Sequence, residues 1–345
     1  MNNIQTTVVS SRVRLARNLA GYPFPGALKS AEQGKKIVNE VFSAAARLRA
    51  FRLYSMNVIS ENVARSLCDD HLISTDLAAN KQCGAALIDE EEGDPDEPHG
   101  KFSIMINEED HLREQYIVDG LNLTFAYRKI SEIDDELSKE LRFAFDAQLG
   151  YLTACPTNLG TGMRASAMLF LPGLTRTKKM NSLIRQISCF GHTVRGVYGE
   201  GSVAEGYLYQ ISNEVTLGVD ESYILSEVQR AVLSIVNLEA RSRKQLRGDD
   251  YVGIKDECCR AYGILSNCAS VSYAEFIKLV SDVKLGVALG FLETERFAML
   301  DELAAAARPA NISLLADGPL SSSERDIYRA EKCREALKAV HRIDS

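Results

Sequence analysis

Residues 155–166 read CPTNLGTGMRAS, and this stretch decides how the rest of the chain is interpreted. Its two glycines would let backbone amides approach an anion closely, and Arg164 follows soon after them. An arginine side chain is permanently charged and presents a planar fork of donors that matches phosphate oxygens. The stretch therefore predicts a phosphate contact at Arg164.

Four more arginines stand in equally unusual phrases. The phrases are SSRVRLARN at 10–18, NEEDHLR at 107–113 and RGVYGEG at 195–201, and they supply Arg12, Arg14, Arg113 and Arg195. Because Arg12 and Arg14 alternate with Val13, an extended segment would point both to one face. Together with Arg164 they would clamp a triphosphate, and neither GxxxxGK[ST] nor GxGxxG occurs as a competing phosphate loop. Taken singly, each arginine is more often a surface charge or a structural ion pair.

Two carboxylates complete the pattern. Glu109 stands in NEEDH, directly after the apolar run 102–106, and Glu200 stands in RGVYGEG. An acidic run is usually a solvated loop, but acids at a strand end are in a common position for catalytic groups. Carboxylates that face an arginine cluster across a cleft would bind a cation beside ATP, and a guanidinium is a natural candidate.

Composition narrows the class of protein. The chain has 345 residues, 46% of them hydrophobic and 25% charged, with a net charge of −7, so we expect a large buried core and neither a nucleic-acid nor an anionic-membrane binder. Its eight cysteines form no CxxC pair and its five histidines are scattered, which signals neither a disulfide framework nor a metal-binding side-chain cluster. With no apolar leader or spanning run visible, we expect a cytoplasmic protein.

Periodicity predicts the main elements. Helical spacing is visible over 30–51, 225–247, 273–287, 294–307 and 323–343. Strand-like runs occupy 85–88, 102–106 and 207–217, and the acidic tract 89–97 reads as a hairpin loop. Residues 248–250, Gly-Asp-Asp, break the helical pattern, so we expect a domain at 1–247 and an all-helical domain at 248–345.

The ordered phrases, with YQISN at 209–213 added, resemble the catalytic domain of phosphagen kinases such as arginine and creatine kinase over roughly residues 8–245. The resemblance implies an α+β fold, with a mainly antiparallel sheet flanked by helices. Phosphagen kinases carry a helical domain before SSRVR, whereas here that phrase begins at Ser10. The later phrases LVSDVKLGVALG (279–290) and ERDIYRAEKCREAL (324–337) resemble bacterial protein-arginine kinases of the McsB type.

This resemblance implies a role for particular residues. Arg12, Arg14, Arg113, Arg164 and Arg195 would bind ATP, His71 would stack on adenine, and Glu109 and Glu200 would engage the target guanidinium. Cys155 would be the thiol beside that group. Arg325, Asp326 and Arg329 would bind phosphoarginine, although Ser323 and Asp326 also have the spacing of an ordinary helix cap. Which glutamate accepts the proton is left open.

The implied activity is ATP- and Mg²⁺-dependent phosphorylation of arginine side chains in proteins, which marks them for regulated degradation or stress control. The implied partners are a second copy of the chain, a zinc-containing activator, heat-shock repressor substrates and a Clp-type unfoldase. Two alternatives remain: a kinase of free guanidines, and a catalytically dead adaptor that binds phosphoarginine.

Overall fold

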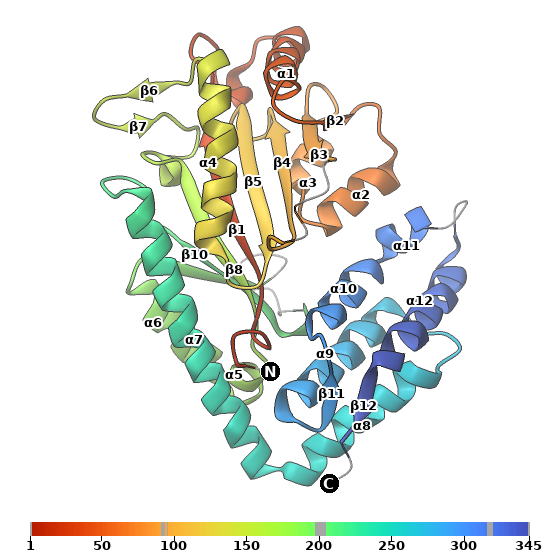
Figure 1. Ribbon diagram of the computed structural model, residues 1–345. Helices are drawn as coiled ribbons and strands as arrows, with labels where there is room; N and C mark the ends of the chain where they lie inside the picture. The colour runs from red at the N-terminus through yellow and green to blue at the C-terminus, as the bar shows by residue number, and fades with distance from the viewer. Residues whose placement is uncertain (1, 91–93, 95, 197–204, 316–319, 344–345) are drawn as a thin grey trace.

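The structure is a computed structural model that describes residues 2–90, 94, 96–196, 205–315 and 320–343. Glu200 and much of the acidic tract 89–97 lie outside the described residues. Figure 1 shows a sheet with helices against it, followed by a helical C-terminal region. The C-terminal region comprises the residues from Tyr251 onward.

The described residues before Tyr251, which we call the catalytic region after the predicted catalytic domain, are built on one eight-stranded sheet, in the order β2-β3-β4-β5-β1-β8-β10-β9. Every neighbouring pair in it is antiparallel, which confirms the predicted sheet. The strands are β1 Val8–Arg17, β2 Phe51–Ser55, β3 Ala85–Asp89, β4 Gly100–Ile106, β5 Leu112–Asp119, β8 Met163–Phe170, β9 His192–Gly196 and β10 Leu208–Asn213. A separate hairpin pairs β6 Phe145–Asp146 with β7 Gly150–Tyr151.

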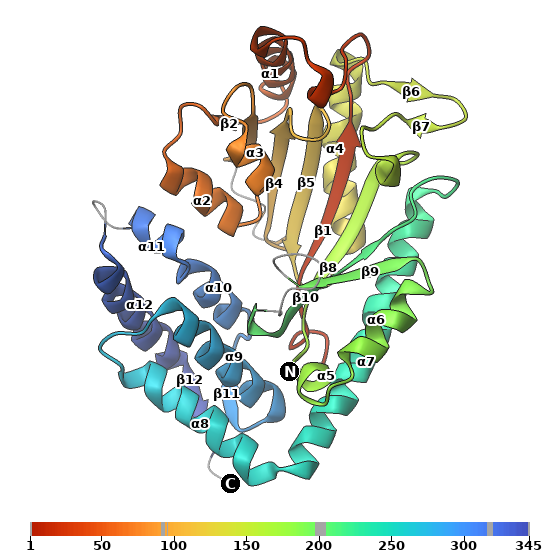
Figure 2. The same ribbon diagram turned by 180° about the vertical axis from the view of Figure 1, so that it is seen from behind.

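Helices cover one face of the sheet, as Figure 1 shows for α4 (Leu123–Glu140) and α7 (Glu221–Asp249). Val13 and Leu15 of β1 are buried in the core on that side, because strand alternation sends them away from Arg12 and Arg14. Figure 2 shows the other face, which lies nearer to α2 and the C-terminal region.

The remaining helices of the catalytic region are short or amphipathic. They are α1 Ala31–Ala45, α2 Glu61–Asp69, α3 Thr75–Ala79, α5 Pro172–Arg176 and α6 Met180–Ser188, with 3₁₀ turns at Pro25–Ala27, Pro156–Asn158 and Glu205–Tyr207. The predicted helix 30–51 begins as expected, because the side chain of Ser30 caps it by accepting a hydrogen bond from the amide of Gln33. It ends at Ala45, and Phe51 already starts β2.

The predicted strand 207–217 is shorter than expected. β10 ends at Asn213, whose side chain accepts from the amide of Ala165 at 2.8 Å and donates to the carbonyl of Val215 at 3.0 Å. The side chain thus replaces a strand partner and turns the chain away.

The C-terminal region consists of α8 Tyr251–Asn267, α9 Tyr273–Leu289, α10 Ala298–Ala306, α11 Pro309–Leu315 and α12 Ser322–Ala336, with a 3₁₀ turn at Leu337–Ala339. It is helical as predicted, except for a small sheet of β11 Leu292–Thr294 with β12 Val340–Arg342. Two predicted helices, 294–307 and 323–343, are therefore too long at the ends where these strands form. Among the described helices, none combines the length and apolar character needed to cross a bilayer.

Two sets of polar contacts are among those that join the C-terminal region to the catalytic region. Asn311 of α11 accepts a hydrogen bond from Ser66 Oγ at 2.6 Å and donates to Asp70 Oδ1 at 2.9 Å, at the end of α2. Further along the chain, Arg176 binds Glu257, and its Nη1 lies 3.8 Å from Asp282 Oδ1. These contacts place the C-terminal region beside a cavity that is also lined by the end of α2 and by the sheet.

Candidate active site

Strand register brings the predicted arginines to one face of the sheet. Arg14 stands opposite Arg164 across β1 and β8, and opposite Gln115 across β1 and β5. Directly opposed residues of antiparallel strands share a face, as do residues two apart on one strand. Arg12 and Arg113 therefore lie on this face as well. By the same register Arg195 of β9, opposite Gln210 of β10, joins them.

The arginines are close enough to disturb one another. Burial, followed by repulsion from Arg113 and Arg164, lowers the pKa of Arg12 to about 10. Burial is also the main cause that holds the pKa of Arg14 well below its ordinary value, and Arg12 is the next. The buried Nε atoms of Arg14 and Arg113 have no hydrogen-bond partner among the described residues. Buried cations without compensation are costly, so this face is suited to a polyanion.

Neighbouring polar side chains hold three of these guanidinium groups in place. Arg164 donates from Nε and Nη2 to Ser212 Oγ at 3.2 and 3.0 Å, and from Nη2 to Thr193 Oγ1 at 3.2 Å. Arg12 donates to Gln210 Oε1 at 3.0 Å. In the third case, Arg113 Nη1 lies 2.6 Å from Glu108 Oε2, and Glu108 also accepts from Ser74. Such anchoring orients donors before a ligand arrives.

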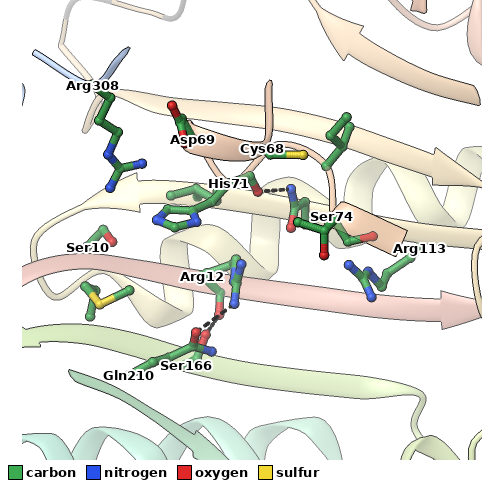
Figure 3. Close-up of a pocket in the computed structure, with 15 residues that line it drawn as sticks. Ser10, Arg12, Cys68, Asp69, His71, Ser74, Arg113, Ser166, Gln210 and Arg308 are labelled. Carbon is green, nitrogen blue, oxygen red and sulfur yellow. Dashed lines mark hydrogen bonds between the residues drawn. The ribbon is translucent and has the colours of Figure 1, made fainter. Parts of the chain in front are cut away.

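A cavity of about 400 Å³ lies over part of this face. It is bordered by the sheet, by the end of α2 and by the C-terminal region, and Figure 3 shows the labelled side chains that line it. Arg12 and Arg113 line this cavity, whereas Arg14 and Arg164 lie beyond it on the same sheet face. Its other walls include Ser10, His71, Met168, Gln210 and Arg308.

His71 lies in this cavity, where an adenine-stacking residue was predicted. It follows the end of α2 and has a positive φ of 59°, which turns the chain sharply after that helix. Burial first, then repulsion from Arg308 and Arg12, lowers the pKa of His71 to about 3. The imidazole is therefore neutral at physiological pH and offers a flat, uncharged ring to a planar partner.

The predicted acidic phrase forms the tight turn between β4 and β5. Within it, Asp110 is buried and accepts hydrogen bonds from Asn18 Nδ2 at 2.6 Å and the amide of Ala154 at 2.7 Å. Asp110 thereby ties the segment before Cys155 to this turn. His111 accepts from the amide of Leu19 at Nδ1, which leaves Nε2 to donate to the carbonyl of Pro23 at 3.0 Å. Both residues are structural supports.

Glu109 and Cys155 meet as a result. Partial burial of the carboxyl group, followed by the charges of Asp110 and Glu108, raises the pKa of Glu109, and a hydrogen bond with the Cys155 side chain opposes part of this rise. Cys155 Sγ also lies 3.0 Å from Thr157 Oγ1. Cys155 is also close enough to contribute to the electrostatic surroundings of Arg164, so the carboxylate, the thiol and the arginine cluster lie near one another. Glu200, the second predicted carboxylate, lies outside the described residues.

The glycine loop before Arg164 serves a different purpose from the predicted one. The amides of Gly160 and Thr161 donate to the carbonyls of Tyr151 and Thr216. Gly160 has a φ of +109°, and a Cβ there would lie 2.3 Å from the carbonyl oxygen of Thr216. The fold therefore already uses the amide of Gly160, and the expectation that it faces an anion is wrong; for the amide of Gly162 it stays a prediction.

The predicted phosphoarginine-binding residues lie on α12, on the C-terminal region. Arg329 is 1% exposed and donates to the carbonyls of Ala307 and Val271 at 2.9 Å, and to Asp326 Oδ1 at 2.6 Å. Arg325 donates to the carbonyl of Leu320. The helix begins one residue earlier than predicted, after a capping box of Ser321 and Glu324, so the cap suggested for Ser323 and Asp326 is wrong.

Two site residues could not be selected from the sequence. Glu108 orients Arg113, whereas the neighbouring Glu109 is the predicted catalytic residue. The roles of these two glutamates differ because the turn points their side chains in different directions, which the sequence does not show. Arg308 lines the cavity from the C-terminal region, far along the chain from every other lining residue.

With this geometry established, comparison with known proteins identifies the family. Residues 33–242 match the family model "ATP:guanido phosphotransferase, C-terminal catalytic domain". Residues 252–345 match "Protein-arginine kinase McsB C-terminal domain". A protein named protein-arginine kinase from Clostridium kluyveri is 41% identical over 98% of this chain and 99% of its own. The chain belongs to the protein-arginine kinase family.

Other relatives agree with this assignment. Proteins of the same name from Symbiobacterium thermophilum and Bacillus cereus are 40% and 39% identical, each over 96% of this chain, and over 93% and 92% of their own. Among solved structures, the duplicated taurocyamine kinase from Schistosoma mansoni, with bound transition-state-analogue components, matches 69% of the chain with a TM-score of 0.58 and 29% identity. The match spans a third of that longer protein. A lombricine kinase shares the fold, with a TM-score of 0.57, 23% identity and coverage of 69% of this chain and 67% of its own.

Proposed function

We propose that the protein transfers the γ-phosphoryl group of ATP to arginine side chains of other proteins, as the name of its relatives states for them. The observation that carries the proposal is the set of five arginines on one sheet face, two of which, Arg14 and Arg113, have a buried Nε atom without a hydrogen-bond partner among the described residues. Phosphoryl transfer mainly requires positioning and charge neutralisation, which such a face supplies.

The proposed site has a nucleoside end and a phosphate end. His71 and the 400 Å³ cavity would hold the nucleoside, with Arg12 and Arg113 beside it. Arg14, Arg164 and Arg195 would then receive the outer phosphates toward Cys155 and Glu109. We propose that magnesium enters bound to phosphate oxygens of the nucleotide and neutralises part of their charge.

Glu109 would act on the acceptor. A guanidinium is a poor nucleophile because it is protonated, so a carboxylate must orient it and take its proton as the N–P bond forms. The raised pKa of Glu109 makes it a better proton acceptor than an ordinary glutamate. We propose that Glu200 shares this role, and that Cys155 lies beside the bound guanidinium.

Further proposals concern the wider role. We propose that α12, through Arg325, Asp326 and Arg329, binds phosphoarginine, and that chain 1–247 and chain 248–345 act as separate domains. The match of the second family model to residues 252–345 supports both. Marking of proteins for degradation or stress control, a homodimer, a zinc-containing activator and a Clp-type unfoldase also remain proposals. A cytoplasmic location fits eight cysteines that are all free thiols.

The test is phosphosite mapping under non-acidic conditions after incubation with ATP, magnesium and an unstructured arginine-rich protein. Glu109→Gln and Glu200→Gln should each lower turnover by on the order of 10²-fold or more, while ATP affinity is kept. Glu136→Gln, at an exposed position on α4, is the matched control. Near-normal turnover in either site variant removes that glutamate from the mechanism. Faster phosphorylation of free arginine than of protein would favour the free-guanidine alternative, and no phosphorylation would favour the adaptor.

A further inference from the structure

One of the positively charged residues that line the cavity beside the arginine face belongs to the C-terminal region. Arg308 lies in the connection between α10 and α11, and it lines the same cavity as His71 and Arg12. Figure 3 shows its side chain entering from the side opposite the β1 strand and pointing toward His71. The C-terminal region therefore places a guanidinium inside the candidate nucleotide site.

No partner holds this guanidinium within the described part of the chain. Among the described residues, its side chain makes no hydrogen bond or ion pair, although it acts at longer range on the carboxylate of Asp69. Other arginines of the region are engaged: Arg296 pairs with Glu302, and Arg329 binds backbone carbonyls. A half-buried cation with all its donors available is a group that can bind a ligand.

The backbone around Arg308 is nevertheless held firmly. On one side, the carbonyl of Ala307 accepts a hydrogen bond from the buried Arg329. On the other side, Asn311 bridges Ser66 and Asp70 of the catalytic region. Arg308 thus projects from a short segment fixed at both ends, so little backbone freedom would be lost when it binds a ligand.

The surroundings indicate which part of a nucleotide Arg308 would reach. Its charge acts on His71 and Asp69, which lie at the end of the cavity near α2. By contrast, the charges that lower the pKa of Arg14 are those of Arg12, Arg113 and Arg164, and the charges that lower the pKa of Arg164 are those of Arg195 and Arg113. The site is therefore divided into a phosphate end on the sheet and a second end between His71 and Arg308.

We propose that Arg308 is a nucleotide-binding residue that the C-terminal region contributes, and that it contacts the base and ribose of ATP. The inference rests on the proposed function, because it takes the cavity to be the nucleoside site. Its guanidinium can donate to ring nitrogens or ribose hydroxyls, or stack on the base opposite His71. The ATP site is then shared between the two regions, and neither region alone forms it.

The test uses the full chain and two probes, ATP and inorganic tripolyphosphate, with Kd measured by calorimetry. Arg308→Ala should raise the Kd for ATP by about tenfold, which is what loss of one charged hydrogen bond implies. Its Kd for tripolyphosphate should stay within twofold of the parent, since that probe has no nucleoside. Arg308→Gln, which keeps a polar side chain but removes the charge and the reach of the guanidinium, should give the same pattern. Arg296→Ala is the matched control, because it removes a surface arginine of the same region.

Two results would overturn the inference: an unchanged ATP affinity in both Arg308 variants, or an equal loss for ATP and tripolyphosphate. A third variant separates this failure from failure of the proposed function. Arg12→Ala should weaken both probes. If it does so while the Arg308 variants bind ATP normally, only the role of Arg308 is wrong. If Arg12→Ala changes neither affinity, the nucleotide site itself has been misplaced.

Discussion

Replacing Arg164 by lysine tests whether the guanidinium shape, beyond its charge, is needed for phosphoryl transfer. One edge of Arg164 is bound to Ser212 and Thr193 through Nε and Nη2. Its Nη1 atom makes no hydrogen bond within the described part of the chain, and it is left for a phosphate oxygen. Lysine has a single nitrogen, so it can keep the hydroxyl contacts or reach the phosphate, but not both.

The expected loss follows from this geometry. A hydrogen bond to a charged group contributes about 1.5 to 3 kcal/mol, and lysine forfeits at least one anchoring bond and weakens the phosphate contact. A net loss of about 3 kcal/mol in transition-state binding lowers kcat/KM by on the order of a hundredfold.

Initial rates on an arginine-rich protein, measured over a range of ATP concentrations, would show the effect of Arg164→Lys. Arg128→Lys is the control, because Arg128 pairs with Glu97 on the surface of α4 and should tolerate lysine. A kcat/KM for Arg164→Lys within threefold of the parent would refute the reasoning, since charge alone would then suffice.

Two further predictions concern stability. Burial, then the charge of Glu257, raises the pKa of Asp282 to about 6; a raised carboxyl pKa favours the folded state at low pH, and this benefit is lost as pH rises through 6. Asp282→Asn should remove that loss. The free energy of unfolding of the variant, relative to that of the parent, should therefore rise by about 3 kcal/mol from pH 4 to pH 8, as measured by chemical denaturation at the two pH values. Gly160→Ala should destabilise the fold by at least about 2 kcal/mol, because its Cβ would meet the Thr216 carbonyl at a φ only glycine favours. Gly248→Ala, in open space on α7, should be neutral or stabilising, and equal melting temperatures for the two alanine variants would contradict the packing argument.

Local patterns were enough to predict several features of the site. The alternation of Arg12, Val13 and Arg14 gives the shared face directly, because strand periodicity depends only on neighbours. The break at residues 248–250 likewise marks the end of α7 at Asp249, and Asp250 caps the next helix. The assignment of Glu109 and Cys155 came from family resemblance, and the structure brings them together.

Features that depend on distant partners could not be predicted. β12 was interpreted as part of a helix, because its strand conformation depends on pairing with β11, about fifty residues earlier. The burial of Arg329, which family resemblance assigned to phosphoarginine binding, was not visible in the sequence, because it depends on two distant backbone carbonyls as well as on Asp326. The role of Arg308 depends on how α11 docks against α2, which no local spacing records.

The position of β1 has a consequence for how the chain folds. β1 lies in the middle of the sheet, between β5 and β8, and the carbonyl of Arg12 accepts a hydrogen bond from Ser166, which lies 154 residues later. Until β8 is synthesised, β1 has one open edge, and such an edge can pair with other chains. Pairing across so many residues also slows folding, because the entropy of closing the loop is lost before the contact forms. Newly made chains should therefore aggregate most readily when synthesis stalls between β5 and β8.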